Sequence, residues 1–485
     1  MNRTSTIHAF FETAAREPDR VALKRRISPG RWSSMTRSEY AREVRRVARA
    51  LIALGVQPGD RIALCGPNRP EWLLADLGAL AAGAIPAPYY TTLSADQAGY
   101  VLDHSEAVLA VVHDANQIAK LDAVRGRLQR LRARVVMEGS APGALNWADF
   151  VARSSEVPDS AVDERLARLT KDALATLIYT SGTTGPPKAV MISHGNLLFS
   201  AEVVREQLEF RPGDELVSYL PLCHIAEQMA SIHGPSVNGY CIACCERLEE
   251  LPEALREVRP TIFLGVPRVW EKIQSRLEER LSQAPPRKQA LFRWAQKTAL
   301  ARARGERPLL YAAAEALVLR KVRAALGFGR ARRLGTTAAP TPRAVLDYFE
   351  SLGMPLYEVY GQSECTGAAT GNTPDRRRRP DRPRRLPAHH RPQEGPVDHL
   401  RRQERVAAEH RGPAGADPRS GPRGGGGRCA QAPRRAAHAR PGSCAARRPR
   451  LRIHGRDDRG ALPGPALHRA HRAGGGRSEP GARFL

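Results

Sequence analysis

The chain has 485 residues and a formal net charge of +26. The charge is uneven, because residues 373–485 contain 28 Arg and no Lys against 10 acidic residues, a net of +18, which leaves +8 for the first 372 residues. The composition of those 372 residues excludes a collagen, a disordered chain and a small disulfide scaffold, and their length is enough for two or three domains.

Helical and strand patterns alternate along the first part of the chain. Apolar residues at helical spacing predict a helix over 40–54, and an apolar run predicts a strand over 61–65. Another helix is expected to open at residues 68–72, and a second strand is predicted over 108–112. This alternation predicts an α/β fold of layered sheets with flanking helices, in the rhythm of a doubly wound sheet.

We expect neither secretion nor a segment that crosses a membrane. The most apolar stretch, residues 73–86, is shorter than a bilayer span and contains Asp76, and the first 20 residues lack the apolar run of a signal peptide. The eight cysteines are irregularly spaced, which fits reduced thiols. We therefore expect a cytoplasmic protein, and peripheral contact with the inner face of a membrane is compatible with this.

Residues 174–190 read LATLIYTSGTTGPPKAV, an apolar strand followed by a loop of hydroxyl residues and glycines and then by Lys188. Glycines let backbone N–H groups approach an oxyanion, hydroxyls donate further hydrogen bonds, and a lysine adds positive charge. The spacing is not that of a Walker loop. Such a run can also be a plain turn, but the pattern favours a phosphate-binding loop.

Three cysteines lie close together in Tyr240-Cys-Ile-Ala-Cys-Cys245. A thiolate metal site is one interpretation, but a structural zinc needs four ligands and no second cysteine pair lies nearby. The run is also typical of a buried strand in which cysteine acts as a small apolar side chain. We therefore expect a strand here rather than a metal site.

Residues 270–326 form a long, mostly helical stretch that is rich in Arg and Lys and is interrupted at Pro285-Pro286 and at Pro308. Charges in such a pattern are typical of solvated helix faces. We interpret them in that way rather than as a binding patch.

The string YTSGTTGPPKAV, residues 179–190, resembles the signature loop of the adenylate-forming superfamily, which includes acyl-CoA synthetases, luciferases and peptide-synthetase adenylation domains. In that superfamily the loop holds the β- and γ-phosphates of ATP while a carboxylate attacks the α-phosphate. Superfamily members usually have Gly where this chain has Ala189, which would be strained by about 1 kcal/mol if the position requires a positive φ. The residues to which the resemblance assigns the phosphate-binding role are Thr180, Ser181, Gly182, Thr183, Thr184, Gly185 and Lys188.

Two later segments resemble further motifs of the superfamily in the same order. Residues 219–227 resemble the motif whose histidine lies beside the acyl and adenylate groups, which implies this role for His224. Residues 335–340 resemble the loop whose backbone lies along adenine, which implies contacts from Thr337, Ala338 and Ala339.

Residues 357–367 resemble the motif in which a tyrosine stacks on adenine, a hydroxyl contacts the α-phosphate and a glutamate binds Mg²⁺. An aromatic face suits a purine, and a carboxylate oxygen suits Mg²⁺. The implied nucleotide contacts are Tyr360, Gly361, Gln362, Ser363 and Glu364. The implied Mg²⁺ ligands are Glu364 and Thr184, and the implied catalytic residues are Thr184, Lys188, His224 and Glu364.

Residues 68–72, 265–272 and the helical stretch that ends at Gly327 resemble the long-chain fatty acyl-CoA synthetase branch. This resemblance implies a ligase with ATP, CoA and a fatty acid as substrates and Mg²⁺ as cofactor. Trp270 is either a gate of the acyl tunnel, as in relatives, or an ordinary core aromatic. Two alternatives stay open: a fatty acyl-AMP ligase or other carboxylate-adenylating enzyme, and a non-catalytic ATP-binding remnant or basic interaction protein.

The resemblance covers residues 1–372, which we expect to form the adenylation domain. We do not find the later motifs of the superfamily, namely a ribose-binding aspartate, a hinge and a catalytic lysine, and the last lysine is Lys321. Residues 373–485 have the composition of a GC-rich gene read in the wrong frame. A selected basic arm is the alternative, although nucleic-acid-binding arms usually contain lysines and interleaved aromatic residues, and these residues include no lysine and only one aromatic residue, Phe484. We therefore expect a disordered tail, an impaired ligase and no nucleic-acid partner.

Overall fold

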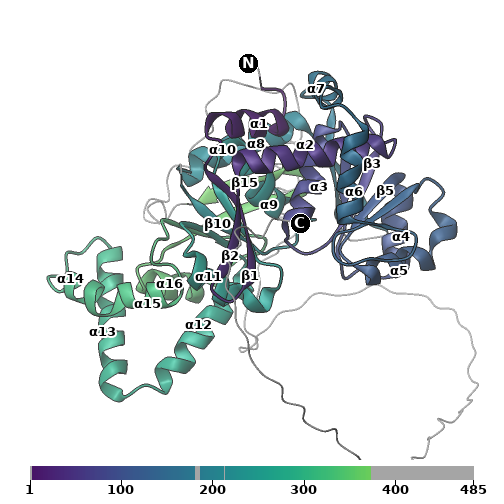
Figure 1. The fold of residues 1–485 in the computed structure, drawn as a ribbon. Coiled ribbons are helices and arrows are strands. Elements are labelled where there is room, and N and C mark those ends of the chain that lie inside the picture. Colours follow the sequence, from purple (N-terminus) through teal and green to yellow (C-terminus); the bar gives the residue numbers. More distant parts are fainter. Residues whose placement is uncertain (1–2, 181–185, 212, 373–485) are drawn as a thin grey trace, which may run out of the picture. The chain divides into compact units, whose positions relative to one another are not determined.

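The computed structural model describes residues 3–180, 186–211 and 213–372 (Figure 1). Every described residue lies in one compact unit of the chain. The predicted tail, residues 373–485, and five residues of the predicted phosphate loop, 181–185, lie outside the described residues. In the described part helices and strands alternate, which confirms the predicted α/β class.

A parallel sheet of five strands has the order β4-β3-β5-β6-β7. Its strands are β3 (Arg61–Cys65), β4 (Ile85–Pro88), β5 (Ala107–Val112), β6 (Ala133–Val136) and β7 (Leu145–Asn146). Its first three connections contain the helices α3 (Pro70–Ala81), α4 (Ala95–His104) and α5 (Ala115–Ala123). Every residue of β5 is buried, as expected for a central strand of a sheet that is covered on both faces. The predicted strands over 61–65 and 108–112 are confirmed as β3 and β5.

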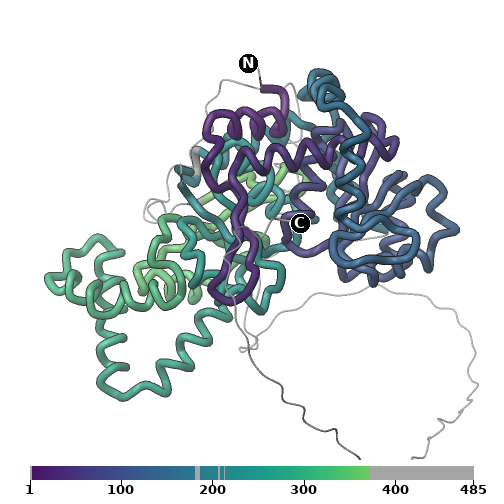
Figure 2. The backbone as a smooth tube through the Cα atoms, in the orientation of Figure 1, coloured from purple at the N-terminus to yellow at the C-terminus, as the bar shows by residue number. Residues whose placement is uncertain are grey.

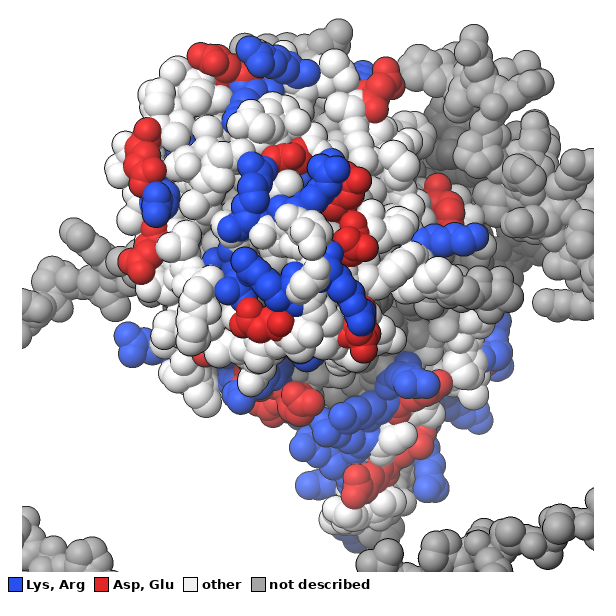
Figure 3. Space-filling view, turned by 90° about the vertical axis from the view of Figure 1, so that its right-hand side faces the viewer, with Lys and Arg blue, Asp and Glu red and all other residues white. Residues whose placement is uncertain are grey.

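Charges alternate on the surface of this sheet and its helices. Figure 3 shows the side on which α4, α5 and β5 lie in Figure 1, and basic and acidic side chains are interleaved there. Ion pairs in this part of the fold include Arg127–Asp96 at 2.8 Å and Arg132–Asp60 at 3.0 Å. The arginines of these pairs therefore have carboxylate partners within the same part of the fold.

Helix α3 is buried along its whole length. It begins with Pro70 at its first position, where a backbone N–H group would have no partner within the helix. It contacts β1 (Val21–Ser28), β3 and β4. It also packs closely on α2 (Arg37–Ala53), because a Cβ at Gly78 would lie 2.5 Å from Val47 Cγ1. Helix α2 corresponds to the helix predicted over 40–54 and begins with a capping box of Thr36 and Glu39.

A second sheet, with the order β10-β11-β1-β2, joins the N-terminus to a much later part of the chain. Its strands are β1 (Val21–Ser28), β2 (Arg31–Thr36), β10 (Glu215–Ser218) and β11 (Cys241–Cys244). In Figure 2 the purple N-terminal hairpin runs beside teal segments, and β1 pairs in parallel with β11. All four residues of β11 are buried, which confirms the strand predicted around Cys241.

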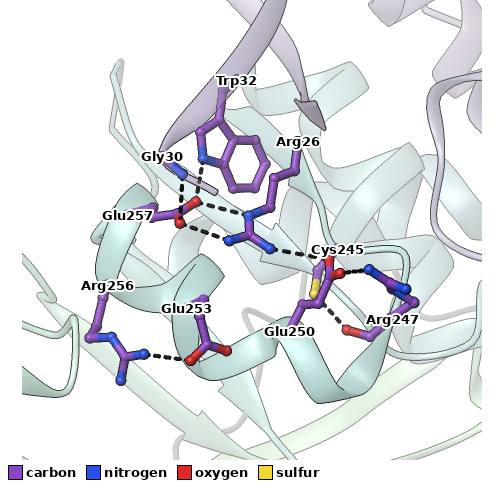
Figure 4. Close-up of polar contacts among 9 residues, drawn as sticks. All are labelled: Arg26, Gly30, Trp32, Cys245, Arg247, Glu250, Glu253, Arg256 and Glu257. Carbon is purple, nitrogen blue, oxygen red and sulfur yellow. Dashed lines mark hydrogen bonds and ion pairs between the residues drawn. The ribbon is translucent and has the colours of Figure 1, made fainter. Parts of the chain in front are cut away.

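Polar contacts hold the β1–β2 hairpin on α11 (Leu251–Val258), as Figure 4 shows. Glu257 accepts hydrogen bonds from Arg26 Nε at 3.0 Å, from Arg26 Nη2 at 2.8 Å, from Trp32 Nε1 at 2.8 Å and from the Gly30 N–H at 2.9 Å. These bonds lower the pKa of the Glu257 carboxyl, and the hydrogen bond to Arg26 is the largest cause. The turn of the hairpin is thereby tied to the second half of the chain.

A third sheet has the order β12-β13-β14-β15, and a separate antiparallel pair is formed by β8 and β9. The strands are β8 (Leu174–Thr180), β9 (Lys188–Ser193), β12 (Ile262–Gly265), β13 (Arg333–Thr336), β14 (Leu356–Gln362) and β15 (Gly367–Asn372). Because β12, β13 and β14 are parallel, their carboxyl ends meet at one edge of the sheet.

A group of helices lies to one side of the sheets, with α14 at its outer end (Figure 1). We call residues 267–325 the helical arm; it consists of α12 (Pro267–Ser282), α13 (Pro286–Ala303), α14 (Tyr311–Ala314), the π-helix η5 (Glu315–Leu319) and α15 (Arg320–Ala325). The breaks before α13 and before α14 coincide with the predicted interruptions at Pro285-Pro286 and Pro308. No helix among the described residues is both long and apolar enough to cross a membrane.

The remaining helical elements complete the described part of the chain. They are α1 (Thr6–Arg16), η1 (Arg125–Arg127), α6 (Trp147–Ala152), η2 (Arg153–Glu156), α7 (Ser160–Ala167), α8 (His194–Leu208), α9 (Ile225–Gln228), η3 (Met229–His233), α10 (Gly234–Asn238), η4 (Leu248–Glu250), α16 (Arg343–Ser351) and η6 (Ser363–Cys365).

Candidate active site

The β8–β9 hairpin holds both ends of the predicted phosphate loop. Thr180 is the last residue of β8 and pairs with Lys188, the first residue of β9. The loop therefore starts and ends at neighbouring positions, although its residues 181–185 are outside the described part. Lys188 is exposed, and no carboxylate among the described residues pairs with its ammonium group.

Hydrogen bonds connect this hairpin to α4. Tyr100 Oη donates to the Pro187 carbonyl at 3.0 Å, and Tyr179 Oη donates to the Val101 carbonyl at 3.3 Å. Tyr179 Oη also lies 3.0 Å from His104 Nδ1. These bonds fix the backbone on both sides of the loop, including the backbone of Pro187 next to Lys188.

Ala189, which stands where the resemblance implies Gly, lies within β9 opposite Tyr179. It is not among the described residues with a positive φ, so an alanine fits the position without backbone strain. The penalty that the sequence would imply for a positive φ therefore does not apply to Ala189.

The predicted adenine loop follows β13. The Thr337 N–H donates to the Gly265 carbonyl at 3.0 Å, which ties the start of the loop to the end of β12. Thr336 and Thr341 are joined by a 2.7 Å hydrogen bond between their hydroxyls, which closes the loop. Ala338 has φ +72°, and both Ala338 and Ala339 are exposed. The loop thus presents its backbone and small side chains at the carboxyl edge of the third sheet.

The residues predicted to bind adenine and Mg²⁺ lie at the β14–β15 turn. Tyr360 is 57% exposed, and Glu364 is exposed on η6 with no ion-pair partner among the described residues. Gly361 is held where no other residue fits, because a Cβ there would lie 2.0 Å from the Gly367 carbonyl oxygen. The close approach of these two glycines sets the path of the chain between Tyr360 and Glu364.

His224 caps the N-terminus of α9. Its Nδ1 accepts a hydrogen bond from the Ala226 N–H at 3.2 Å, and burial lowers the pKa of the imidazole. A neutral ring that accepts at Nδ1 carries its proton on Nε2. Nε2 is therefore the nitrogen that can donate to a ligand.

The structure brings these motifs together. Strand β9, which begins with Lys188, contacts η6, which carries Glu364, and α9, which begins after His224, contacts β15. A Cβ at Gly367 would lie 3.1 Å from Met229 Cγ, immediately after α9. The elements that carry Lys188, Tyr360 and Glu364 therefore meet beside the carboxyl edge of the third sheet, which is where open α/β sheets bind ligands.

Glu227 is a buried carboxylate near this site to which the sequence analysis assigned no role. Its Oε1 accepts hydrogen bonds from Ser218 Oγ and Ser231 Oγ, both at 2.6 Å, and Asn68 Nδ2 lies 3.4 Å away. Asn68 also donates to the Leu220 carbonyl at 2.8 Å. Burial raises the pKa of Glu227 to about 7. The network fixes the segment that leads from β10 to His224, and no local sequence pattern marks it.

Trp270 is fully buried in an aromatic cluster. Its ring centroid lies 4.9 Å from that of Phe349 and 5.5 Å from that of Phe263, and its Nε1 donates to the Gly335 carbonyl at 3.1 Å. Trp270 therefore anchors α12 to β13, the strand that precedes the predicted adenine loop. Its contact with an acyl chain stays a prediction.

Comparisons with known proteins identify relatives of this chain. The sequence profile of the AMP-binding enzyme family matches residues 10–389. The chain is similar to the long-chain-fatty-acid–CoA ligase ACSBG2 of Xenopus laevis, with 37% identity over 388 residues that are 76% of this chain and 52% of that protein. It is also similar to the long-chain-fatty-acid–CoA ligase FadD15 of Mycobacterium bovis, with 35% identity over 74% of this chain and 60% of the relative. The chain thus spans between about half and three fifths of the length of these relatives.

Solved structures show the same fold. The N-terminal domain of FACL13 from Mycobacterium tuberculosis matches with a TM-score of 0.57 and 20% identity, over 77% of this chain and 80% of that one. The anthranilate CoA ligase AuaEII in complex with anthranoyl-AMP matches with a TM-score of 0.56 and 19% identity, over 76% of this chain and 61% of that one.

Proposed function

Because the chain belongs to the AMP-binding enzyme family, we propose that it activates a long-chain fatty acid with ATP and transfers the acyl group to CoA. The observation that carries this proposal is that β9, which begins with Lys188, contacts η6, which carries Glu364, and that α9, which follows His224, contacts β15. The choice of a fatty acid is supported by the relatives named as long-chain-fatty-acid–CoA ligases.

The proposed reaction has two steps. A carboxylate oxygen of the fatty acid attacks the α-phosphorus of ATP, the bond to the bridging oxygen breaks, and pyrophosphate leaves. The CoA thiol then loses its proton and attacks the carbonyl carbon of the acyl-adenylate, and AMP leaves. Catalysis of the first step requires stabilisation of the charge that builds on pyrophosphate.

The phosphate groups of ATP would be held by the loop between Thr180 and Lys188, with Ser181, Gly182, Thr183, Thr184 and Gly185 in the same role. The Lys188 ammonium is exposed and unpaired among the described residues, so it is available to a polyphosphate. Glu364 is likewise exposed and unpaired, and its carboxylate suits Mg²⁺, with Thr184 as a further ligand. The ion, when bound, would neutralise phosphate charge.

The nucleoside would lie between the loop after β13 and the exposed ring of Tyr360. Backbone groups of Thr337, Ala338 and Ala339 would lie along adenine, and Gly361, Gln362 and Ser363 would line the same side. An exposed ring of this kind offers a stacking surface that stabilises a bound base by about 1 to 3 kcal/mol, if stacking on nucleic-acid bases is a fair guide. His224, neutral near pH 7, would donate from Nε2 to the acyl or adenylate oxygens.

The test compares Lys188→Ala with the control Lys171→Ala, because both lysines are exposed and neither pairs with a described carboxylate. We expect Lys188→Ala to lower fatty-acid-dependent ATP–pyrophosphate exchange by about 10²-fold, the typical effect of removing one charge-stabilising contact. Lys171→Ala should leave the exchange rate unchanged, and neither variant should alter the urea midpoint of unfolding. Equal exchange rates in the two variants would contradict the assignment of Lys188.

The products separate the proposed ligase from its alternatives. Formation of palmitoyl-CoA from palmitate, ATP and CoA supports the ligase, whereas palmitoyl-AMP that accumulates without thioester supports an acyl-AMP ligase. Binding of ATP without pyrophosphate exchange would leave a nucleotide-binding protein with no ligase activity.

A further inference from the structure

The outer part of the helical arm has an exposed surface of unusual composition (Figure 1). Leu309 is 99% exposed, and Leu310 and Leu317 are more than half exposed. Between residues 309 and 325 the exposed side chains belong only to Leu, Ala, Arg and Lys: Leu309, Leu310, Ala312, Ala316, Leu317, Arg320, Lys321, Ala324 and Ala325. A solvated helix face normally mixes both signs of charge with polar residues, so the lack of carboxylates and amides on this one needs a reason.

The helical arm also holds the excess positive charge of residues 1–372. It contains 14 Lys and Arg and 5 Glu, a net of +9, whereas residues 1–372 together have +8. The remainder of that part of the chain is therefore at −1. The net positive charge of residues 1–372 thus lies on the helical arm.

The basic side chains around the exposed leucines are not neutralised within the fold. Arg304, Arg307, Arg320 and Lys321 are exposed and form no ion pair with any described carboxylate, and Glu306 is the one exposed carboxylate among residues 304–325. The parallel sheet of five strands and its helices differ, because Arg127 and Arg132 there pair with Asp96 and Asp60. The sequence interpretation of solvated helix faces therefore does not explain the segment from 304 to 325.

The charge of this surface limits what can cover it. A second copy would bring an identical positive surface, and the chain's own residues 373–485 carry a net charge of +18, so both would be repelled. A single-stranded nucleic acid would favour aromatic side chains for stacking, but the exposed large apolar side chains of the arm are all leucines. An anionic partner with an apolar layer fits both features.

We propose that residues 304–325 dock the protein on the surface of a membrane that contains anionic phospholipids. Arg304, Arg307, Arg320 and Lys321 would lie against lipid phosphates while Leu309, Leu310 and Leu317 enter the boundary between headgroups and acyl chains. Apolar side chains surrounded by lysine and arginine are the composition of interfacial helices. Each basic residue near an anionic surface strengthens binding by about fivefold. The proposal concerns binding only and does not depend on the proposed reaction.

The first experiment measures binding of the full chain to vesicles. Vesicles of phosphatidylcholine alone are compared with vesicles that also contain phosphatidylglycerol. We expect the pair Arg304→Glu and Arg307→Glu to weaken binding to the anionic vesicles by about tenfold or more. The pair Arg31→Glu and Arg125→Glu changes the net charge equally at exposed, unpaired arginines outside the arm, and should have a much smaller effect. Equal losses in the two pairs would overturn the proposal.

The second experiment locates the contact, because the basic residues 373–485 can also adsorb to anionic vesicles. Leu309→Trp is compared with Leu248→Trp, an exposed leucine outside the arm, in vesicles whose acyl chains carry bromine. Bromine quenches tryptophan fluorescence only near the acyl layer, and the five native tryptophans give both variants the same background. We expect additional quenching in Leu309→Trp alone. Bound protein without that additional quenching, or no binding to anionic vesicles, would overturn the proposal.

Discussion

The buried carboxylate of Glu227 links the folding of the site to pH. Burial raises its pKa from 4.5 to about 7 against the opposing effect of hydrogen bonds from Ser218 and Ser231. The folded state therefore holds a proton that the unfolded chain releases. Its contribution to stability is fully present below pH 4.5 and is lost as the pH rises to about 7.

This predicts a changed pH dependence in Glu227→Gln. The free energy of unfolding of the native protein should fall by about 3 kcal/mol between pH 4.5 and 7 because of this carboxyl. The amide of the variant accepts the two serine hydrogen bonds but cannot ionise, so this fall should be absent in Glu227→Gln. Urea unfolding at several pH values measures the slope, with Glu202→Gln, at an exposed position of α8, as the control. The buried Asp76 also has a raised pKa, but it is present in every variant, so its contribution to the pH dependence is the same in all of them. An unchanged slope in Glu227→Gln would mean that the carboxyl does not titrate in this range.

The candidate site residues that the sequence predicted belong to short, continuous motifs. The string around Lys188 and the string around Glu364 carry the resemblance by themselves, and the structure brings their elements into contact. Glu227 could not be found in this way, because its partners Asn68, Ser218 and Ser231 come from three separate segments. The sequence also could not decide the backbone at Ala189, since φ depends on the β8–β9 pairing and not on the residue alone.

Among the elements, the β14–β15 hairpin positions Tyr360 and Glu364. Its register shifts between Tyr360 and Gly361, at the point where Gly361 approaches the Gly367 carbonyl. A bulge changes the direction of the side chains beside it. Here it lies between the aromatic ring of Tyr360 and the carboxylate of Glu364, which are four residues apart. The geometry of the proposed nucleotide site therefore depends on one glycine.

We predict that Gly361→Ala disrupts this hairpin. The added Cβ would lie 2.0 Å from a backbone oxygen that cannot move without breaking the strand pairing, so we expect a loss of about 2 kcal/mol or more in stability and weaker ATP binding. Gly371→Ala in the same hairpin is the matched control, because the nearest atom to its added Cβ is 3.8 Å away. Thermal unfolding and ATP titration of both variants give the comparison. Similar behaviour of the two would show that the bulge can relax.

Elements with strong local signals were predicted and others were not. Strands β3 and β5 follow from their apolar runs, and the helix α2 follows from its periodicity. The pairing of β1 with β11 has no local signal, because parallel strands so far apart are selected by packing of the whole chain. Trp270 is a similar case. Its residue type is compatible with a core position or a tunnel position, and only the fold shows its hydrogen bond to the Gly335 carbonyl.

At the scale of the whole molecule, contacts between early and late residues hold the N-terminal strands on the rest of the described fold. Glu257 of α11 accepts hydrogen bonds from Arg26, Gly30 and Trp32 of the β1–β2 hairpin (Figure 4). Arg26 also pairs with Glu250 at 3.3 Å. Charged hydrogen bonds that join distant segments stabilise a fold more than exposed pairs along one helix.

Glu257→Gln should therefore destabilise the protein by about 1 to 3 kcal/mol, because it removes the charge that binds the Arg26 guanidinium and the Trp32 indole. Glu253→Gln is the matched control: Glu253 lies one turn earlier on α11, and its pair with Arg256 is exposed on both sides, so its loss should be below about 0.5 kcal/mol. The lowered pKa of Glu257 means that its contribution is present above pH 4.5 and is lost as the pH falls below that value. Urea unfolding should thus show a large difference between the two variants at pH 7 that shrinks toward pH 3. A difference that stays constant with pH would show that Glu257 acts through packing and not through its charge.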